Sequence, residues 1–145
     1  PVAVFILGSF ISFSTGTSYG TMGILMPLAI PLAYAVGKNY GLDGDAMHAY
    51  MIVNISSVLT GAIFGDHCSP ISDTTILSSM GAGCSHIDHV STQMIYALSV
   101  CAVCVLVGYL PVALGLSVWI ALPCGFLAIW ALVRFVGKKV EEKAA

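Results

Sequence analysis

Two apolar segments, residues 92–110 and 112–136, are each close to the length of about 20 residues that a helix needs to cross a bilayer. The rest of the chain is also apolar: 58% of its 145 residues are hydrophobic and only 8% are charged. A soluble domain has about 25% charged residues. The sequence therefore predicts an all-α integral membrane protein in contact with lipid, and these two segments are expected to be regular transmembrane helices. No basic stripe is present, so nucleic acid is not an expected partner.

A first polar interruption, residues 14–21, lies between two shorter apolar segments. The segment before it has about 13 residues, and neither this segment nor the one at 22–36 is long enough to span a bilayer. Two short arms around a polar, glycine-containing tip predict a re-entrant hairpin, whose tip must be buried or line a wet cavity. One interrupted helix, or a glycine-rich loop at the membrane surface, is the alternative.

A second polar interruption, residues 65–75, contains two aspartates and a proline. Pro70 lacks an N–H and pushes Ser69 toward extended geometry, so a helix is expected to open here and leave carbonyl groups unpaired. Residues 46–65 before it are long enough for a span, and residues 74–83 after it form a short helical piece. We therefore predict one broken, tilted transmembrane helix.

Small and polar residues in the broken helix suggest how it packs. Gly61 and Gly65 form a small-x-x-x-small pair that allows another helix to approach closely, although such a pair also arises by chance in glycine-rich sequence. Asn54 is expected to bond a neighbouring helix rather than an ion. The five cysteines lie mostly within apolar runs and are expected to pack without disulfides.

Basic residues follow the last apolar segment, namely Arg134, Lys138, Lys139 and Lys143. The positive-inside rule then predicts a cytoplasmic C-terminus and a hairpin that enters from outside. Residues 1–137 are expected to form a membrane transport domain and residues 138–145 a cytoplasmic tail. Pro1 stands where an initiator Met is expected, which suggests a fragment or a processed piece. The organisation resembles one inverted-repeat half plus a final helix.

Two stretches resemble the NhaC-type Na+/H+ antiporter family of the ion-transporter superfamily: residues 13–27, which contain Phe-Ser-Thr-Gly-Thr-Ser-Tyr-Gly-Thr, and residues 65–75, Gly-Asp-His-Cys-Ser-Pro-Ile-Ser-Asp-Thr-Thr. Residues 84–93 also look like that family's continuation. The resemblance covers roughly residues 1–110 and implies the C-terminal portion of a longer transporter in the bacterial cytoplasmic membrane. It further implies that a hairpin tip, here residues 14–18, meets a broken helix at the membrane midplane. A missing N-terminal half is then an expected partner, and homo-oligomerisation is left open.

The chemistry of the two aspartates suits a small hard cation. A charged residue at bilayer depth costs roughly 2.5 to 3.5 kcal/mol on the insertion scale, so its presence calls for a function. Carboxylate, hydroxyl and carbonyl oxygens are the ligands that hard cations prefer. We expect Asp73 to be the principal Na+ and H+ carrier and Asp66 the second. The predicted cation and proton site comprises Asp66, Asp73, Ser69, Ser72, Thr74, Ser14, Thr15 and Thr17. The alternative is a structural kink in which Asp73 and Ser72 cap the second helical piece.

Three histidines near the second interruption, His67, His86 and His89, are candidates for proton relay or pH sensing, because imidazole changes its charge near neutral pH. Hydrogen-bonded structural histidines are the alternative. Cys84, His86, Asp88 and His89 match no established zinc spacing, and residues 84–91 are expected to form a solvated cytoplasmic loop. No metal beyond Na+ and no cofactor is expected.

The sequence thus predicts a secondary active transporter, a Na+/H+ antiporter that exchanges cytoplasmic Na+ for external H+ by alternating access. A Na+-coupled organic acid or amino acid exchanger of the same family, malate/lactate-like, is the alternative. An enzyme is not expected: an intramembrane metalloenzyme using Asp66, His67, His86 and His89 would lack the common H-E-x-x-H and G-x-S-x-G motifs. A non-transporting membrane subunit is a further alternative, and it predicts that Asp73→Asn leaves function unchanged.

Overall fold

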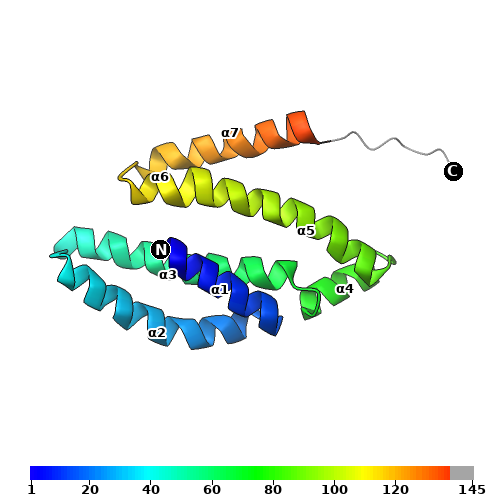
Figure 1. Ribbon diagram of the computed structural model, residues 1–145, viewed down its shortest axis with the longest axis horizontal. Helices are drawn as coiled ribbons and strands as arrows, with labels where there is room; N and C mark the ends of the chain where they lie inside the picture. Colours follow the sequence, from blue (N-terminus) through cyan, green and yellow to red (C-terminus); the bar gives the residue numbers. More distant parts are fainter. Residues whose placement is uncertain (138–145) are drawn as a thin grey trace. The chain divides into compact units, whose positions relative to one another are not determined.

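The structure is a computed structural model that describes residues 1–137, and every regular element in that part of the chain is helical (Figure 1). Four helical runs are long and apolar enough to cross a membrane: Ser18–Asn39, Gly44–Cys68, His86–Ala113 and Val118–Val136. The predicted all-helical class is therefore confirmed. The tail predicted for residues 138–145 lies outside the described residues. The chain divides into two units, residues 1–99 and the remainder, and each is described by itself.

The first unit contains α1 (Val2–Thr15), α2 (Ser18–Asn39), α3 (Gly44–Cys68), α4 (Asp73–Gly81) and most of α5 (His86–Val103). Both α1 and α2 pack against α3, and Figure 1 shows α1 crossing it. The buried core between these three helices includes Phe5, Leu25, Val58 and Ala62. Polar side chains are buried with them, and this is the part of the molecule where the candidate site lies.

Glycines allow α1 and α3 to cross with their backbones in contact. A Cβ atom at Gly61 would lie 2.5 Å from the carbonyl oxygen of Phe5, and one at Gly65 would lie 2.2 Å from the carbonyl oxygen of Ser9. Real Cβ atoms do not approach so closely, so a larger residue at either position would force the helices apart. The predicted small-x-x-x-small contact is confirmed, and α1 is its partner.

The turn between α1 and α2 is shorter than the predicted polar tip. Only Gly16 and Thr17 lie outside the helices, because Thr17 caps α2 by accepting a hydrogen bond from the Gly20 N–H at 3.3 Å. As a result α2 has 22 residues, with Pro27 and Pro31 inside it, and is long enough to cross a membrane. The expected pair of helices around a turn is present, and its re-entrant insertion stays a prediction.

The second interruption lies where the sequence predicts it. Helix α3 ends at Cys68 and α4 begins at Asp73, so residues 69–72 form the break. The polar loop expected at residues 84–91 is wrong over most of its length, because α5 begins at His86. This error has a local cause: Ser91 and Thr92 hydroxyls donate to the Asp88 carbonyl within the helix, so polar side chains are satisfied without leaving it.

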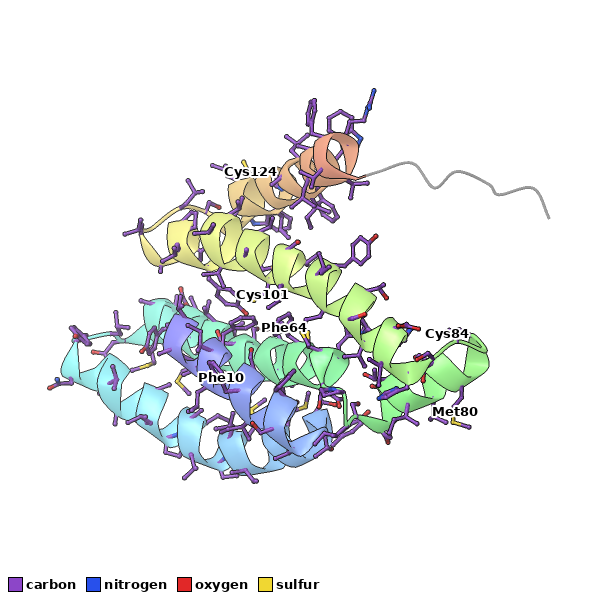
Figure 2. All side chains as sticks on the ribbon, turned by 45° about the vertical axis from the view of Figure 1, so that its right-hand side comes forward. Phe10, Phe64, Met80, Cys84, Cys101 and Cys124 are labelled. Atoms are coloured by element: carbon purple, nitrogen blue, oxygen red, sulfur yellow. The ribbon has the colours of Figure 1, made fainter. Side chains whose placement is uncertain are left out.

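The second unit contains the end of α5, a π-helical turn η1 (Cys104–Tyr109), α6 (Leu110–Ala113) and α7 (Val118–Val136), which packs against η1. Pro111 lies between the two apolar segments of the sequence, and the helix continues past it to Ala113. A proline ring clashes with the carbonyl four residues earlier, and the wider π-helical turn lies at that position. Cys101 and Cys124 are marked in Figure 2, and none of the five cysteines, all of which lie within residues 1–137, forms a disulfide.

Candidate cation site

The break between α3 and α4 is shaped by Pro70. Ser69, the residue before it, has extended geometry with φ −70° and ψ 128°, as expected for a residue that precedes proline. Ser72 is also extended and is the N-cap of α4. Four residues therefore run between the end of one helix and the N-terminus of the next, within an otherwise helical, apolar region.

The two polar interruptions of the sequence meet at this break. Gly16, in the turn between α1 and α2, has a left-handed φ of 68°, and a Cβ there would lie 3.0 Å from the carbonyl oxygen of Ile71. Ser69, which is fully buried, donates its hydroxyl hydrogen to the Phe13 carbonyl oxygen at 2.7 Å. The turn is thus held against the break by a close backbone approach and by a hydrogen bond.

Asp66, in the last turn of α3, lies at the centre of this contact and is only 8% exposed. Its Oδ2 accepts a hydrogen bond from Ser18 Oγ at 2.9 Å, and its Oδ1 accepts one from Ser72 Oγ at 2.7 Å. Thr74 Oγ1 lies 2.7 Å from Ser72 Oγ. Because the single hydroxyl hydrogen of Ser72 goes to the carboxylate, Thr74 is the donor in this last pair.

The charge around Asp66 comes from helix ends rather than from basic side chains. Ser18 is the first residue of α2, and Ser72 precedes the first residue of α4, so two helix N-termini with their partial positive charge are turned toward the carboxylate. Lys38 is the one lysine or arginine in residues 1–99, and it pairs with Asp43 at the opposite end of α2. Within the first unit, Asp66 therefore has no cationic side chain as a partner.

The other residues that the sequence analysis assigned to the site are placed differently. Asp73 is exposed, and its Oδ1 accepts a hydrogen bond from the Thr74 N–H at 2.8 Å. Ser14 and Thr15 donate to carbonyl oxygens of their own helix, and Thr17 caps α2. The structure thus joins Ser72 to Asp66 directly and Thr74 to Asp66 only through Ser72, and it holds Ser69 beside them through a hydrogen bond to α1.

Ser18 was missed as a site residue. A signal for it was present in the sequence, since a threonine such as Thr17 is a favoured N-cap and places the next residue in the first turn of a helix. The alternative, in which Ser72 and Asp73 cap α4, fits the two residues differently: the Ser72 side chain makes no capping hydrogen bond and donates to Asp66, whereas Asp73 Oδ1 accepts from the Thr74 N–H in the first turn.

The three candidate histidines make different contacts, and of these His67 and His86 lie beside the break. His67 is bonded by Gln93 of α5, whose amide nitrogen donates to the His67 carbonyl oxygen at 2.8 Å and to the ring Nε2 at 2.9 Å. Nε2 therefore carries no hydrogen in this arrangement. His86 lies 2.7 Å from the Pro70 carbonyl oxygen through its own Nε2. His89 Nε2 and Gln93 Oε1 are buried and have no hydrogen-bond partner among the described residues.

A transition-metal site is not formed by these residues. Within residues 1–137, no three histidine, cysteine, aspartate or glutamate side chains lie close enough together to hold a metal ion. Cys84 lies in the turn between α4 and α5 (Figure 2), and its thiol donates to the Ser79 carbonyl oxygen at 3.7 Å.

Helices long and apolar enough to cross a membrane, one of them broken beside a buried carboxylate, define a multi-pass helical membrane protein. Comparison with known families identifies the family to which this membrane protein belongs. The Na+/H+ antiporter family matches residues 1–114, and the chain belongs to this family. The family resemblance noted in the sequence is thereby confirmed.

Several relatives carry informative descriptions. An uncharacterized protein of Haemophilus influenzae is 47% identical over 117 residues, which are 81% of this chain and 20% of the relative. An uncharacterized Na+/H+ antiporter of the same organism is 34% identical over 62% of this chain and 17% of its own length. A malate-2H+/Na+-lactate antiporter of Bacillus subtilis is 32% identical over 64% of this chain and 18% of its own length. The chain spans a fifth or less of these relatives, and no solved structure matches it.

Proposed function

We propose that this chain is the ion-binding part of a Na+/H+ antiporter in which Na+ and H+ compete for Asp66. Family membership and the antiporters among its relatives support a transport function. The observation that carries the proposal is the buried Asp66 carboxylate, which accepts hydrogen bonds from Ser18 and Ser72 and has no basic side chain beside it in the first unit. Such a site attracts a cation and leaves the carboxylate free to take one.

Competition follows from the chemistry of this oxygen cluster. Na+ is a hard cation and takes oxygen ligands, which Asp66, Ser18, Ser72 and Thr74 all supply. The hydroxyl groups rotate, so each presents a lone pair when a cation is bound and a hydrogen when the carboxylate is empty. A proton on Asp66 removes its negative charge and occupies an oxygen lone pair, so one carboxylate serves one ion at a time.

Asp66 takes the principal role in this proposal, and Asp73 a secondary one, which reverses the order expected from the sequence. Asp66 is buried with two hydroxyl partners, whereas Asp73 is exposed and bonds the backbone at the start of α4. Ser69 contributes by holding the turn of α1 and α2 against the break. Ser14 and Thr15 lie in the last turn of α1 and Thr17 caps α2, and the proposal gives these three residues no direct contact with the ion.

Alternating access at a bacterial cytoplasmic membrane completes the proposal, with residues 1–137 as part of the transport domain and the remaining length of the protein supplying the rest of the cavity. Arg134 in the last turn of α7 supports a cytoplasmic C-terminus under the positive-inside rule. Ions that cross with a net charge respond to the membrane potential, at about 2.3 kcal/mol per charge per 100 mV.

A Na+-coupled organic acid exchanger remains the second candidate, because one relative is a malate-2H+/Na+-lactate antiporter. In that case Na+ would still occupy Asp66, and the acid's carboxylate would face the N-terminus of α2 or α4.

Proteoliposomes that contain the protein at its full natural length provide the test. A Na+ gradient should drive a pH change in the wild type without any organic acid, Asp66→Asn should abolish it, and Asp73→Asn, the matched comparison, should retain most of it. A wild type that responds to Na+ only when malate or lactate is added would establish the exchanger instead. Full activity in Asp66→Asn would remove Asp66 from the ion path.

A further inference from the structure

His86, the first residue of α5, contacts both ends of α4. Its Nε2 lies 2.7 Å from the carbonyl oxygen of Pro70, which is in the break before α4. Its Nδ1 lies 3.2 Å from the hydroxyl oxygen of Ser79, which is near the end of α4 and only 2% exposed. The side chain thus joins α5, the break and α4.

The direction of the first of these hydrogen bonds is fixed. A carbonyl oxygen only accepts, so the His86 Nε2 carries the hydrogen and donates it to Pro70. Pro70 lies outside the helices, and among the described residues His86 is the donor found for its carbonyl oxygen. An opened helix leaves carbonyl groups without their usual partner, and here an imidazole from another element supplies the donor.

This contact lies two residues from the candidate ion site. Ser72 donates to Asp66 at 2.7 Å, and its position depends on the path of the chain from Pro70. Helix α4 is therefore held at its N-terminal end by Ser72 and at its C-terminal end by Ser79, with His86 connected to both ends. The His86 contact is one of the side-chain hydrogen bonds that hold the break to other elements, and that of Ser69 to the Phe13 carbonyl oxygen is another.

We propose that His86 is a positioning residue for the cation site: its Nε2–H holds the Pro70 carbonyl and so keeps the Ser72 hydroxyl within reach of Asp66. The proposal rests on the proposed ion-binding role of Asp66. His86 does not touch the ion in this account. Its effect is expected mainly on the Na+ concentration for half-maximal transport and less on the maximal rate.

Two substitutions separate the donor from the bulk of the side chain. His86→Leu removes both ring nitrogens, whereas His86→Gln keeps an amide N–H donor that can take the place of Nε2. His86→Leu should raise the half-maximal Na+ concentration by roughly 3- to 10-fold, the ratio expected for one lost hydrogen bond, and His86→Gln should restore it to within about twofold. His48→Leu changes an exposed histidine at the far end of α3 and should have no effect.

A second readout does not require transport. Cys68 ends α3 beside the break and is buried, so the rate at which a maleimide alkylates it, measured by mass spectrometry of its peptide, reports how open the break is. Alkylation should be faster in His86→Leu than in wild type or His86→Gln, in the full-length protein in membranes.

Na+-dependent transport and Cys68 alkylation together show whether the proposed function or the positioning role of His86 has failed. A wild type without Na+-driven transport, combined with faster alkylation in His86→Leu alone, would overturn the proposed function and keep His86 as the residue that holds the break. Normal Na+ dependence and normal alkylation in His86→Leu would overturn the positioning role. Equal defects in the leucine and glutamine variants would also overturn it, because the donor would then not be what matters.

Discussion

Ser18 Oγ donates a hydrogen bond to Asp66 Oδ2 at 2.9 Å, joining the first turn of α2 to the last turn of α3 across 48 residues of sequence. The bond brings a polar turn and a broken helix, each of which would be costly alone in an apolar environment, into one partly dry cluster. Hydrogen bonds to a charged group are among the stronger ones in proteins. Ser18 is therefore expected to affect both the shape of the site and its affinity for a cation.

Ser18→Ala should weaken Na+ binding. It removes a hydroxyl that bonds the empty carboxylate and that offers an oxygen to the bound ion, so the half-maximal Na+ concentration should rise by roughly tenfold, as for a lost hydrogen bond to a charged group. The measurement is Na+-driven proton movement by the full-length protein in proteoliposomes. Ser14→Ala is the matched control, because Ser14 donates to the Phe10 carbonyl oxygen within α1. Equal effects of the two alanines would contradict the assignment.

The close crossing of α1 and α3 predicts that Gly65→Ala lowers stability. The added methyl group would lie 2.2 Å from the Ser9 carbonyl oxygen and 2.8 Å from the Phe13 amide nitrogen, and backbone atoms cannot move aside as a flexible side chain can. Overpacking of this kind costs about 1–3 kcal/mol. Thermal unfolding of the purified protein should show a lower midpoint for Gly65→Ala than for Gly23→Ala, whose added methyl group meets nothing within 4 Å. A midpoint equal to that of the control would mean that the two helices are not in contact there.

Gly16→Ala should affect both stability and ion affinity, and Gly41→Ala only stability. Both glycines have left-handed backbones, with φ of 68° and 72°, where an alanine costs roughly 1–2 kcal/mol. Only Gly16 lies against the break, with the Ile71 carbonyl oxygen 3.0 Å from a Cβ there, whereas a Cβ at Gly41 meets nothing within 4 Å. Melting midpoints and half-maximal Na+ concentrations should be measured for both variants. Their comparison separates the effect of backbone strain, which both variants have, from the effect of the contact with the break, which only Gly16 makes. A normal Na+ affinity in Gly16→Ala would show that the turn does not shape the site.

Much of this architecture was predictable from local sequence chemistry. Pro70 fixed the position of the break, and Gly61 and Gly65 indicated a close helix contact, because both effects depend on a few neighbouring residues. The choice between Asp66 and Asp73 was not predictable in this way. Burial of one and exposure of the other depend on where α1 and α2 cross α3, which no short pattern encodes.

Two further differences between the sequence-based expectations and the structure also arise because a local pattern does not show which partner a side chain bonds. The pairing of Ser18 with Asp66 requires two elements far apart in sequence to meet, so spacing within either motif could not reveal it. The helical start of α5 at His86 was hidden by its polar composition, since hydroxyl groups that bond their own helix look like loop residues in a sequence. Local rules therefore located the breaks, and tertiary contacts decided which side chains meet there.

Competition between Na+ and H+ for one carboxylate predicts a particular pH dependence. If Na+ and H+ compete for one site, the half-maximal Na+ concentration should rise as the pH falls, approaching about tenfold per pH unit for a single competing proton. The maximal rate at saturating Na+ should change much less, because enough Na+ displaces the proton. Na+ titrations of transport at several pH values, with internal and external pH kept equal before each Na+ pulse, measure both quantities.

Two results would contradict this model in different ways. A maximal rate that changes with pH while the half-maximal Na+ concentration stays constant would place the responsive proton away from the Na+ site, and His67, bonded by Gln93 beside Asp66, would then be the first group to substitute. An Asp73→Asn variant that loses the pH dependence while wild-type behaviour persists in Asp66→Asn would restore the order expected from the sequence. Retention of competition in Asp73→Asn, together with loss of transport in Asp66→Asn, would instead tie the exchanged proton to the carboxylate held by Ser18 and Ser72.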